Sequence, residues 1–113
     1  MPAMRVGALP DAALDAAAAF HADVLPKVRS TLSGGEDLVL VFDPASHEHH
    51  AWRLAVVQQL ARDHAPLRVN AIESDDEDAI AAALAYAGSA PGLTGQLLRL
   101  DRNGAGALLS PST

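Results

Sequence analysis

The hydrophobic pattern predicts a buried strand that leads directly into a helix near the middle of the chain. Residues 38–42, LVLVF, form an unbroken apolar run, which is typical of a strand covered on both faces, as in a parallel sheet. Asp43 and Pro44 end this strand, because proline has no amide for the ladder but suits the first turn of a helix. Further strands are predicted at residues 4–9, 67–72 and 96–100.

Helical periodicity fills the stretches between these strands. The first helix begins near Asp11, should bend at Pro26, and has one apolar side when wound at about 100° per residue. The residues on that side are Leu14, Phe20, Val24, Leu25, Val28 and Leu32. A second helix is expected over about residues 45–63 and a third over 74–89, which starts with the capping-box spacing Ser-Asp-Asp-Glu.

This alternation of strands and helices predicts a single α/β domain over residues 1–113. It favours right-handed crossovers and a parallel sheet with helices on both faces. We therefore expect a three-layer half-Rossmann sandwich with three or four parallel strands. Residues 102–113 are expected to form a short edge hairpin, through the Asn103-Gly104 turn, or a loose tail.

Composition narrows the classes of partner. Eight basic against fourteen acidic residues give a net charge of −6, which opposes binding to nucleic acid or to an anionic membrane. The absence of cysteine excludes disulfides, thiolate metal sites and cysteine nucleophiles, and fits a reducing compartment. The sequence has neither a signal-peptide pattern nor an apolar stretch long enough to span a membrane, so we expect a cytoplasmic protein.

A histidine-rich segment follows the central strand, at the edge where open parallel sheets usually bind ligands. His47 and His50 share a helix face, and Asp43 could add an oxygen, which gives a candidate site for a divalent metal. The alternative is a solvated first helical turn capped by Asp43 or Ser46. The candidate ligand crevice comprises Asp43, Ser46, His47, His50, Glu73 and Ser74.

Three segments resemble, in order, the C-terminal half of the short-chain dehydrogenase/reductase family. VLPKVRSTLSGGEDLVLVF is similar to the family's long helix, glycine-rich break and the strand that ends at its catalytic serine. LARDHAPLRVNAI is similar to the run that joins its catalytic helix to the next strand. ALAYAGSAPGLTGQLLRLD is similar to its closing helix, Thr-Gly-Gln turn and final strand. The resemblance covers roughly residues 20–101 and implies the family's fold.

The same alignment implies that the family's chemistry is missing. Ser46 stands where the family has its catalytic tyrosine, His50 stands where it has the lysine, and the position of the catalytic serine falls near Asp43. Glu73-Ser74 replaces a Pro-Gly pair, and the glycine-rich cofactor turn belongs to an N-terminal half that we do not find here. Hydride transfer needs a bound nicotinamide dinucleotide and an acidified phenol. We therefore expect no catalytic residue, no cofactor and no enzyme activity.

A homodimer is expected from the second helix. Its apolar residues spread over about 200°, twice the arc that packing on one sheet needs, so a symmetric partner should cover the excess. The contact would use the first two helices, as in the parent family, or else the last strand and its neighbouring helix. The interface predicted for the first arrangement comprises Phe20, Val24, Val28, Trp52, Arg53, Val56 and Leu60.

Three functions remain open from the sequence. The first is a non-catalytic module for self-association or for binding a protein partner, such as a full-length member of the same family. The second is a small-ligand or divalent-metal binding protein that uses the crevice at the carboxyl ends of the strands. The third, an enzyme of unrelated chemistry, ranks lowest because no set of nucleophile, base and orienting residue can be assembled.

Overall fold

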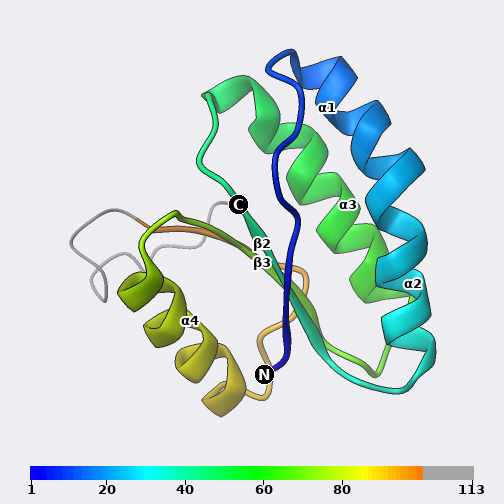
Figure 1. The fold of residues 1–113 in the computed structure, drawn as a ribbon. Helices are drawn as coiled ribbons and strands as arrows, with labels where there is room; N and C mark the ends of the chain where they lie inside the picture. Colours follow the sequence, from blue (N-terminus) through cyan, green and yellow to red (C-terminus); the bar gives the residue numbers. More distant parts are fainter. Residues whose placement is uncertain (101–113) are drawn as a thin grey trace.

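The structure of the protein is a computed structural model that describes residues 1–100. Its sheet consists of four parallel strands in chain order, β1 (Ala3–Arg5), β2 (Leu38–Phe42), β3 (Val69–Glu73) and β4 (Leu97–Arg99) (Figure 1). The predicted α/β sandwich with three or four parallel strands is thus confirmed. The hairpin or tail predicted for residues 102–113 lies outside the described residues.

Helices cover both faces of the sheet (Figure 1). One face carries α1 (Ala13–Ala19), η1 (Phe20–Val24), α2 (Leu25–Ser33), η2 (His47–His49) and α3 (His50–Asp63), and the other carries α4 (Glu77–Ser89). Because side chains alternate along a strand, Leu40 of β2 packs in the core beneath α3 whereas Val39 packs beneath α4. Within residues 1–100, no helix is long and apolar enough to cross a bilayer.

The third crossover has the opposite hand to the first two. The chain adds strands in one direction, from β1 to β4, yet α4 lies on the face opposite α2 and α3. The prediction that every crossover is right-handed is therefore wrong for one of them. The physical reason is coverage. Three crossovers of one hand would put all helices on one face and uncover Val39 and Ile72, which are buried beneath α4.

A π turn at η1 interrupts the first helical stretch, which otherwise runs continuously from Ala13 to Ser33. The Leu25 amide donates to the Phe20 carbonyl, five residues back, immediately before Pro26, which has no amide to donate. The extra residue of this turn rotates α1 by about 100° relative to α2. Leu14, predicted on the buried side, is consequently 86% exposed.

The chain itself covers the apolar arc of α3. The sheet packs against one side of α3, and the helical stretch from α1 to α2 packs against the adjoining side. The residues predicted at a dimer interface therefore lie mostly in the core: Phe20, Val28, Arg53, Val56 and Leu60 are buried, and only Val24 and Trp52 are partly exposed. The wide apolar arc of α3 is thus explained by two covers within the chain, the sheet and the neighbouring helical stretch.

Candidate functional site

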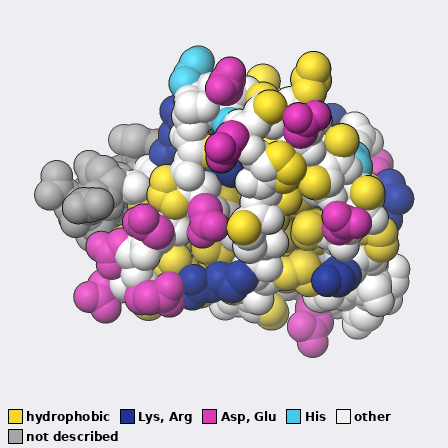
Figure 2. Space-filling model, turned by 45° about the horizontal axis from the view of Figure 1, so that its top comes forward, with side chains coloured by type: hydrophobic (Ala, Val, Ile, Leu, Met, Phe, Trp, Pro, Cys, Tyr) yellow, Lys and Arg dark blue, Asp and Glu magenta, His cyan; other side chains and the backbone are white. Residues whose placement is uncertain are grey.

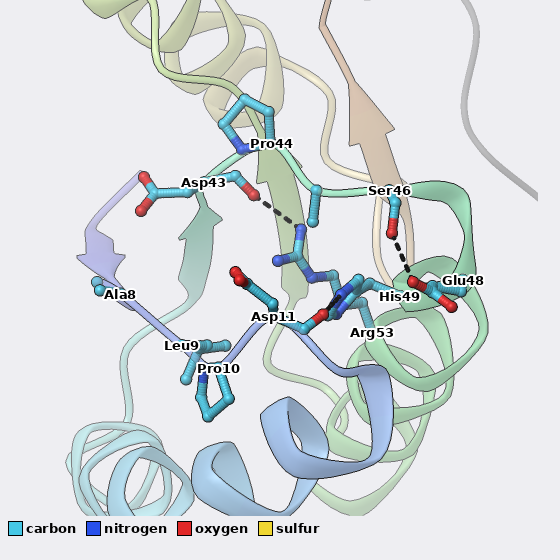
Figure 3. A pocket seen from close by; sticks show the side chains of 12 residues that line it. Ala8, Leu9, Pro10, Asp11, Asp43, Pro44, Ser46, Glu48, His49 and Arg53 are labelled. Carbon is cyan, nitrogen blue, oxygen red and sulfur yellow. Dashed lines mark hydrogen bonds between the residues drawn. The ribbon is translucent and has the colours of Figure 1, made fainter.

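A cavity of about 480 Å³ opens at the carboxyl ends of β1 and β2 (Figure 3). Residues 7–11, which follow β1, form one wall, and residues 43–46, which follow β2, form another. His49 and Arg53 line it from η2 and α3. Gly7 has a φ of +83°, a conformation that favours glycine and lets the chain turn out of β1 into the first wall. The cavity thus lies at the sheet edge where ligands bind in open α/β folds.

Arg53 is a buried cation between α3 and the sheet, only 3% exposed. Its Nη1 donates to the backbone oxygen of Asp43 at 2.9 Å and to Oε2 of Glu73 at 3.0 Å. Its guanidinium carbon lies 4.5 Å from the centre of the Phe42 ring. Glu73 also pairs with Arg99, whose Nε lies 3.3 Å from Oε1. A single buried carboxylate is therefore shared by two arginines.

The positions of Arg53 and Glu73 in their elements require this pairing. Glu73 follows Val69 and Ala71 on the side of β3 that faces α3, because residues two apart in a strand share a face. Arg53 lies on the buried side of α3, which it shares with Val57. A charge at either position is costly to bury alone, so each needs the other.

Part of the Arg53 guanidinium remains available to a ligand. Both of its hydrogen bonds to described residues use Nη1, and Nε is buried without a partner among residues 1–100. Figure 3 shows the guanidinium reaching into the space between Asp11, Asp43 and Ser46. The second amino group, Nη2, makes no hydrogen bond within the described part of the chain. It is therefore free to donate to a ligand in the cavity.

His49 holds the wall formed by residues 7–11 against the start of α3. Its ring is buried, its Nε2 lies 2.8 Å from the backbone oxygen of Asp11, and its Nδ1 lies 3.3 Å from Nε1 of Trp52. Because the tryptophan nitrogen can only donate, Nδ1 must accept, and the assigned proton of the neutral ring sits on Nε2 and is donated to Asp11. Both ring nitrogens are thus occupied by protein partners.

The other predicted crevice residues are divided between the cavity and its surroundings. Asp43 and Ser46 line the cavity, and Ser46 donates from Oγ to Oε1 of Glu48 at 3.1 Å. His47 and His50 lie on one helix face, as predicted, with their rings stacked 6.2 Å apart between centres. Neither histidine lines the cavity. Within residues 1–100 no three potential metal ligands come together, so Asp43 does not complete a site with the histidine pair.

Glu73 and Ser74 have structural roles at the end of β3 instead of lining the cavity. Both are buried, Glu73 in the pair with Arg53 and Ser74 as the acceptor of the Asp76 amide at 3.0 Å. The predicted capping box at Ser74 is replaced by Asp76, which caps α4 by accepting from the amides of Asp78 and Ala79. After β3 the chain is still extended at Asp76, beyond Ser74, where the capping-box spacing places the cap.

Three residues that line the cavity, Asp11, Glu48 and His49, were not predicted as part of the site, and Arg53 was assigned to a dimer contact instead. The sequence shows Arg53 as a charge on the apolar side of a helix and Glu73 as a charge at the end of a buried strand. Their contact could not be predicted, because no local pattern in the sequence links the two positions. Asp11 and His49 are 38 residues apart and meet only because the chain turns at Gly7. Glu48 was visible only as a member of the histidine-rich segment.

The charges around the cavity are mostly negative. Three carboxylates, those of Asp11, Asp43 and Glu48, line it together with the single guanidinium of Arg53. Figure 2 shows acidic side chains spread over this side of the molecule among apolar ones. A nicotinamide dinucleotide, the cofactor of complete members of the family that the sequence resembles, carries a pyrophosphate that these three carboxylates would repel, and the arginine in this cavity is already paired with Glu73. The donor set of this cavity does not fit that cofactor.

Comparison with known proteins identifies the scaffold. The family model described as "Short chain dehydrogenase-like protein" matches residues 4–100, which confirms the resemblance found in three segments of the sequence. No curated protein and no solved structure matches the chain.

Proposed function

Because the chain belongs to the short chain dehydrogenase-like family, we propose that it is a non-catalytic binding module built on that family's Rossmann-like scaffold. Its cavity at the carboxyl ends of β1 and β2 takes a small polar ligand. The observation that carries this proposal is the cavity of about 480 Å³ lined by Arg53, a residue only 3% exposed whose Nη2 has no hydrogen-bond partner among residues 1–100.

The composition of the walls supports binding. Leu9, Pro10 and Pro44 supply apolar surface, while a few polar groups converge from separate elements, which is the usual make-up of a small-molecule site. Asp43 and Arg53 are fixed to each other through the 2.9 Å bond from Nη1 to the Asp43 carbonyl. A site whose polar groups are already positioned loses little entropy when a ligand arrives.

The same contacts argue against acid–base catalysis. A serine acts as a nucleophile when a histidine can take its proton. Ser46 instead donates to Glu48, and both nitrogens of His49 are engaged by Asp11 and Trp52. We therefore propose that the cavity retains its ligand without transforming it.

A ligand screen tests the proposal. The protein is mixed with a library of small polar molecules, and binders are sought by thermal shift and by perturbation of backbone amide signals in NMR. Ligands should raise the melting temperature and perturb the amides of residues 7–11 and 43–49. Asp43→Asn should weaken the response, and Asp63→Asn, at the far end of α3, should leave it unchanged. A library without binders, or perturbations confined to other regions, would contradict the proposal.

Self-association is the second candidate, and a groove on the outer helical surface favours it. The groove, of about 390 Å³, lies between η1 and α3 and is lined by His21, Trp52, Ala55 and Val56, among others. Leu14 is highly exposed on α1, and β1 has a strand neighbour on one side only within residues 1–100. A second copy, or a full-length member of the family, would cover this surface.

Light scattering separates this candidate from the first. A dimer that uses the groove should become monomeric in Ala55→Glu, because the carboxylate would be buried against the partner. The matched control is Ala81→Glu, an equally exposed alanine on α4 at the other face of the sheet. A monodisperse monomer of the unaltered chain at tens of micromolar would count against self-association and leave the cavity proposal intact.

A further inference from the structure

We infer that the cavity binds a small zwitterion, a molecule that carries an ammonium group and an acidic group a few ångströms apart. This inference rests on the binding function proposed above and specifies the chemistry of its ligand. It follows from the way in which the cavity presents charges of both signs, held apart by the fold.

The acidic group of the ligand has a prepared position at Arg53. The guanidinium is held by the bonds of Nη1 to the Asp43 carbonyl and to Glu73, and by the Phe42 ring beneath it. Its planar shape suits a carboxylate or a related oxyanion. Within residues 1–100, Arg53 shares the carboxylate of Glu73 with Arg99, so it does not have that carboxylate to itself.

The ammonium group has a prepared position at two carboxylates. Asp11 follows β1 and Asp43 follows β2, and both line the cavity. Within residues 1–100 neither forms an ion pair at 4.0 Å or less, since the ion pair of Arg53 is with Glu73. Figure 3 shows the Asp11 carboxylate turned toward the Arg53 guanidinium and the Asp43 carboxylate turned away from it, so charges of both signs border the cavity.

Ligands of a single charge are poorer fits. A simple anion would be attracted by Arg53 but repelled by Asp11, Asp43 and Glu48. A simple cation would leave the unpaired amino group of Arg53 without an acceptor. An uncharged polar molecule would balance neither the guanidinium of Arg53 nor the carboxylates. A zwitterion satisfies both sides of the cavity at once and adds no net charge.

Matched ligands test the inference. β-Alanine carries both groups, propionate is the same molecule without the ammonium, and ethylamine is the same molecule without the carboxylate. Affinities are measured by NMR titration of the full chain, and glycine and γ-aminobutyrate vary the spacing between the charges. We expect the best of the three amino acids to bind at least tenfold more tightly than propionate or ethylamine and to perturb residues 7–11 and 43–49.

Charge-removing variants locate the ammonium position. Asp43→Asn and Asp11→Asn should each weaken binding of the amino acid about tenfold, as expected when one partner of a charge-assisted hydrogen bond is lost. Asp63→Asn should have no effect. All three positions are exposed, so the variants should remain folded, and their amide spectra verify this.

The outcomes separate this inference from the function on which it rests. If propionate, ethylamine or an uncharged library compound binds through residues 7–11 and 43–49 as tightly as the best amino acid, the zwitterion inference is wrong and the binding function stands. If no compound of any charge binds there, both are wrong. If the amino acids bind to Asp11→Asn and to Asp43→Asn as tightly as to the unaltered chain, the assigned ammonium position is wrong and the inference falls with it.

Discussion

Two arginine–glutamate pairs lie on opposite faces of the sheet, and they differ in length and above all in burial. Arg53 and Glu73, on the α3 face, are 3.0 Å apart with side chains only 4% and 7% exposed. Arg5 and Glu77, on the α4 face, are closer at 2.7 Å, but their side chains are 55% and 72% exposed. The shorter pair is the weaker one, because water competes for both of its ions. Burial, and not distance, decides how much each pair matters.

The comparison also distinguishes what each face does. On the α3 face the buried pair fixes a guanidinium at the rim of the cavity, next to the Phe42 and Trp52 rings. On the α4 face the core beneath the helix is small and apolar, built around Val39, Ile72, Ala83 and Ala87. Arg5 and Glu77 lie over that core and can be lost without uncovering a charge. Substitutions on the two faces should therefore have very different consequences.

The largest effect is expected for Glu73→Gln. This change leaves Arg53 and Arg99 without their shared carboxylate, and removal of one partner from a buried pair costs about 3–5 kcal/mol. The free energy of unfolding, measured by urea denaturation, should fall by that amount. Glu77→Gln is the matched control on the other face. Equal losses for the two variants would show that burial does not separate the pairs.

An intermediate effect is expected for His49→Ala. The change removes the acceptor of the Trp52 indole and the donor to the Asp11 carbonyl, two part-buried hydrogen bonds, together with a buried ring, so the free energy of unfolding should fall by about 1–3 kcal/mol. It should also loosen the wall of residues 7–11, which limited proteolysis would detect. His47→Ala, on the exposed neighbouring turn, serves as the control and should be close to neutral.

The smallest effect is expected at Arg5 and Glu77, and it depends on pH. The hydrogen bond from Arg5, opposed by desolvation and helped by the charge of Arg5, lowers the pKa of Glu77 from its ordinary value of 4.5. Because the folded pKa lies below the unfolded one, the contribution to stability is complete above about 4.5 and is lost as pH falls through the folded value.

Comparison of Glu77→Gln with the unaltered chain measures this contribution. The two should differ slightly in unfolding free energy at pH 7, the difference should shrink as the pH is lowered below about 4.5, and added salt should shrink it at pH 7. A difference that does not change with pH or salt would mean that the pair does not act through its charges.

The sheet could be predicted from the sequence because its strands lie in short, mostly apolar segments. The segment 38–42 matches β2, and β3 and β4 lie within two residues of their predicted bounds. β1 is shorter than predicted because Gly7 turns the chain away from the sheet. Such runs are local, so a single sequence reveals them.

The site was less predictable because its contacts are long-range. Arg53 was assigned to a dimer contact, since an isolated helix does not reveal that a glutamate on a strand 20 residues later will face it. The bond between His49 and Asp11 depends on how the chain leaves β1 and returns in α1. Periodicity indicates which side of an element is buried, but it does not indicate which buried polar groups meet.

The π turn at η1 keeps the buried residues before and after it on the same side of the helical stretch. Buried residues before and after Pro26 would be spread over about 160° if every turn were regular, whereas the extra residue brings them within about 60°. These residues are Ala16, Phe20, Val28 and Leu32. Deleting one residue between Phe20 and Leu25 would therefore give a regular helix, shorter by one residue, whose two ends still point their apolar sides in the same direction.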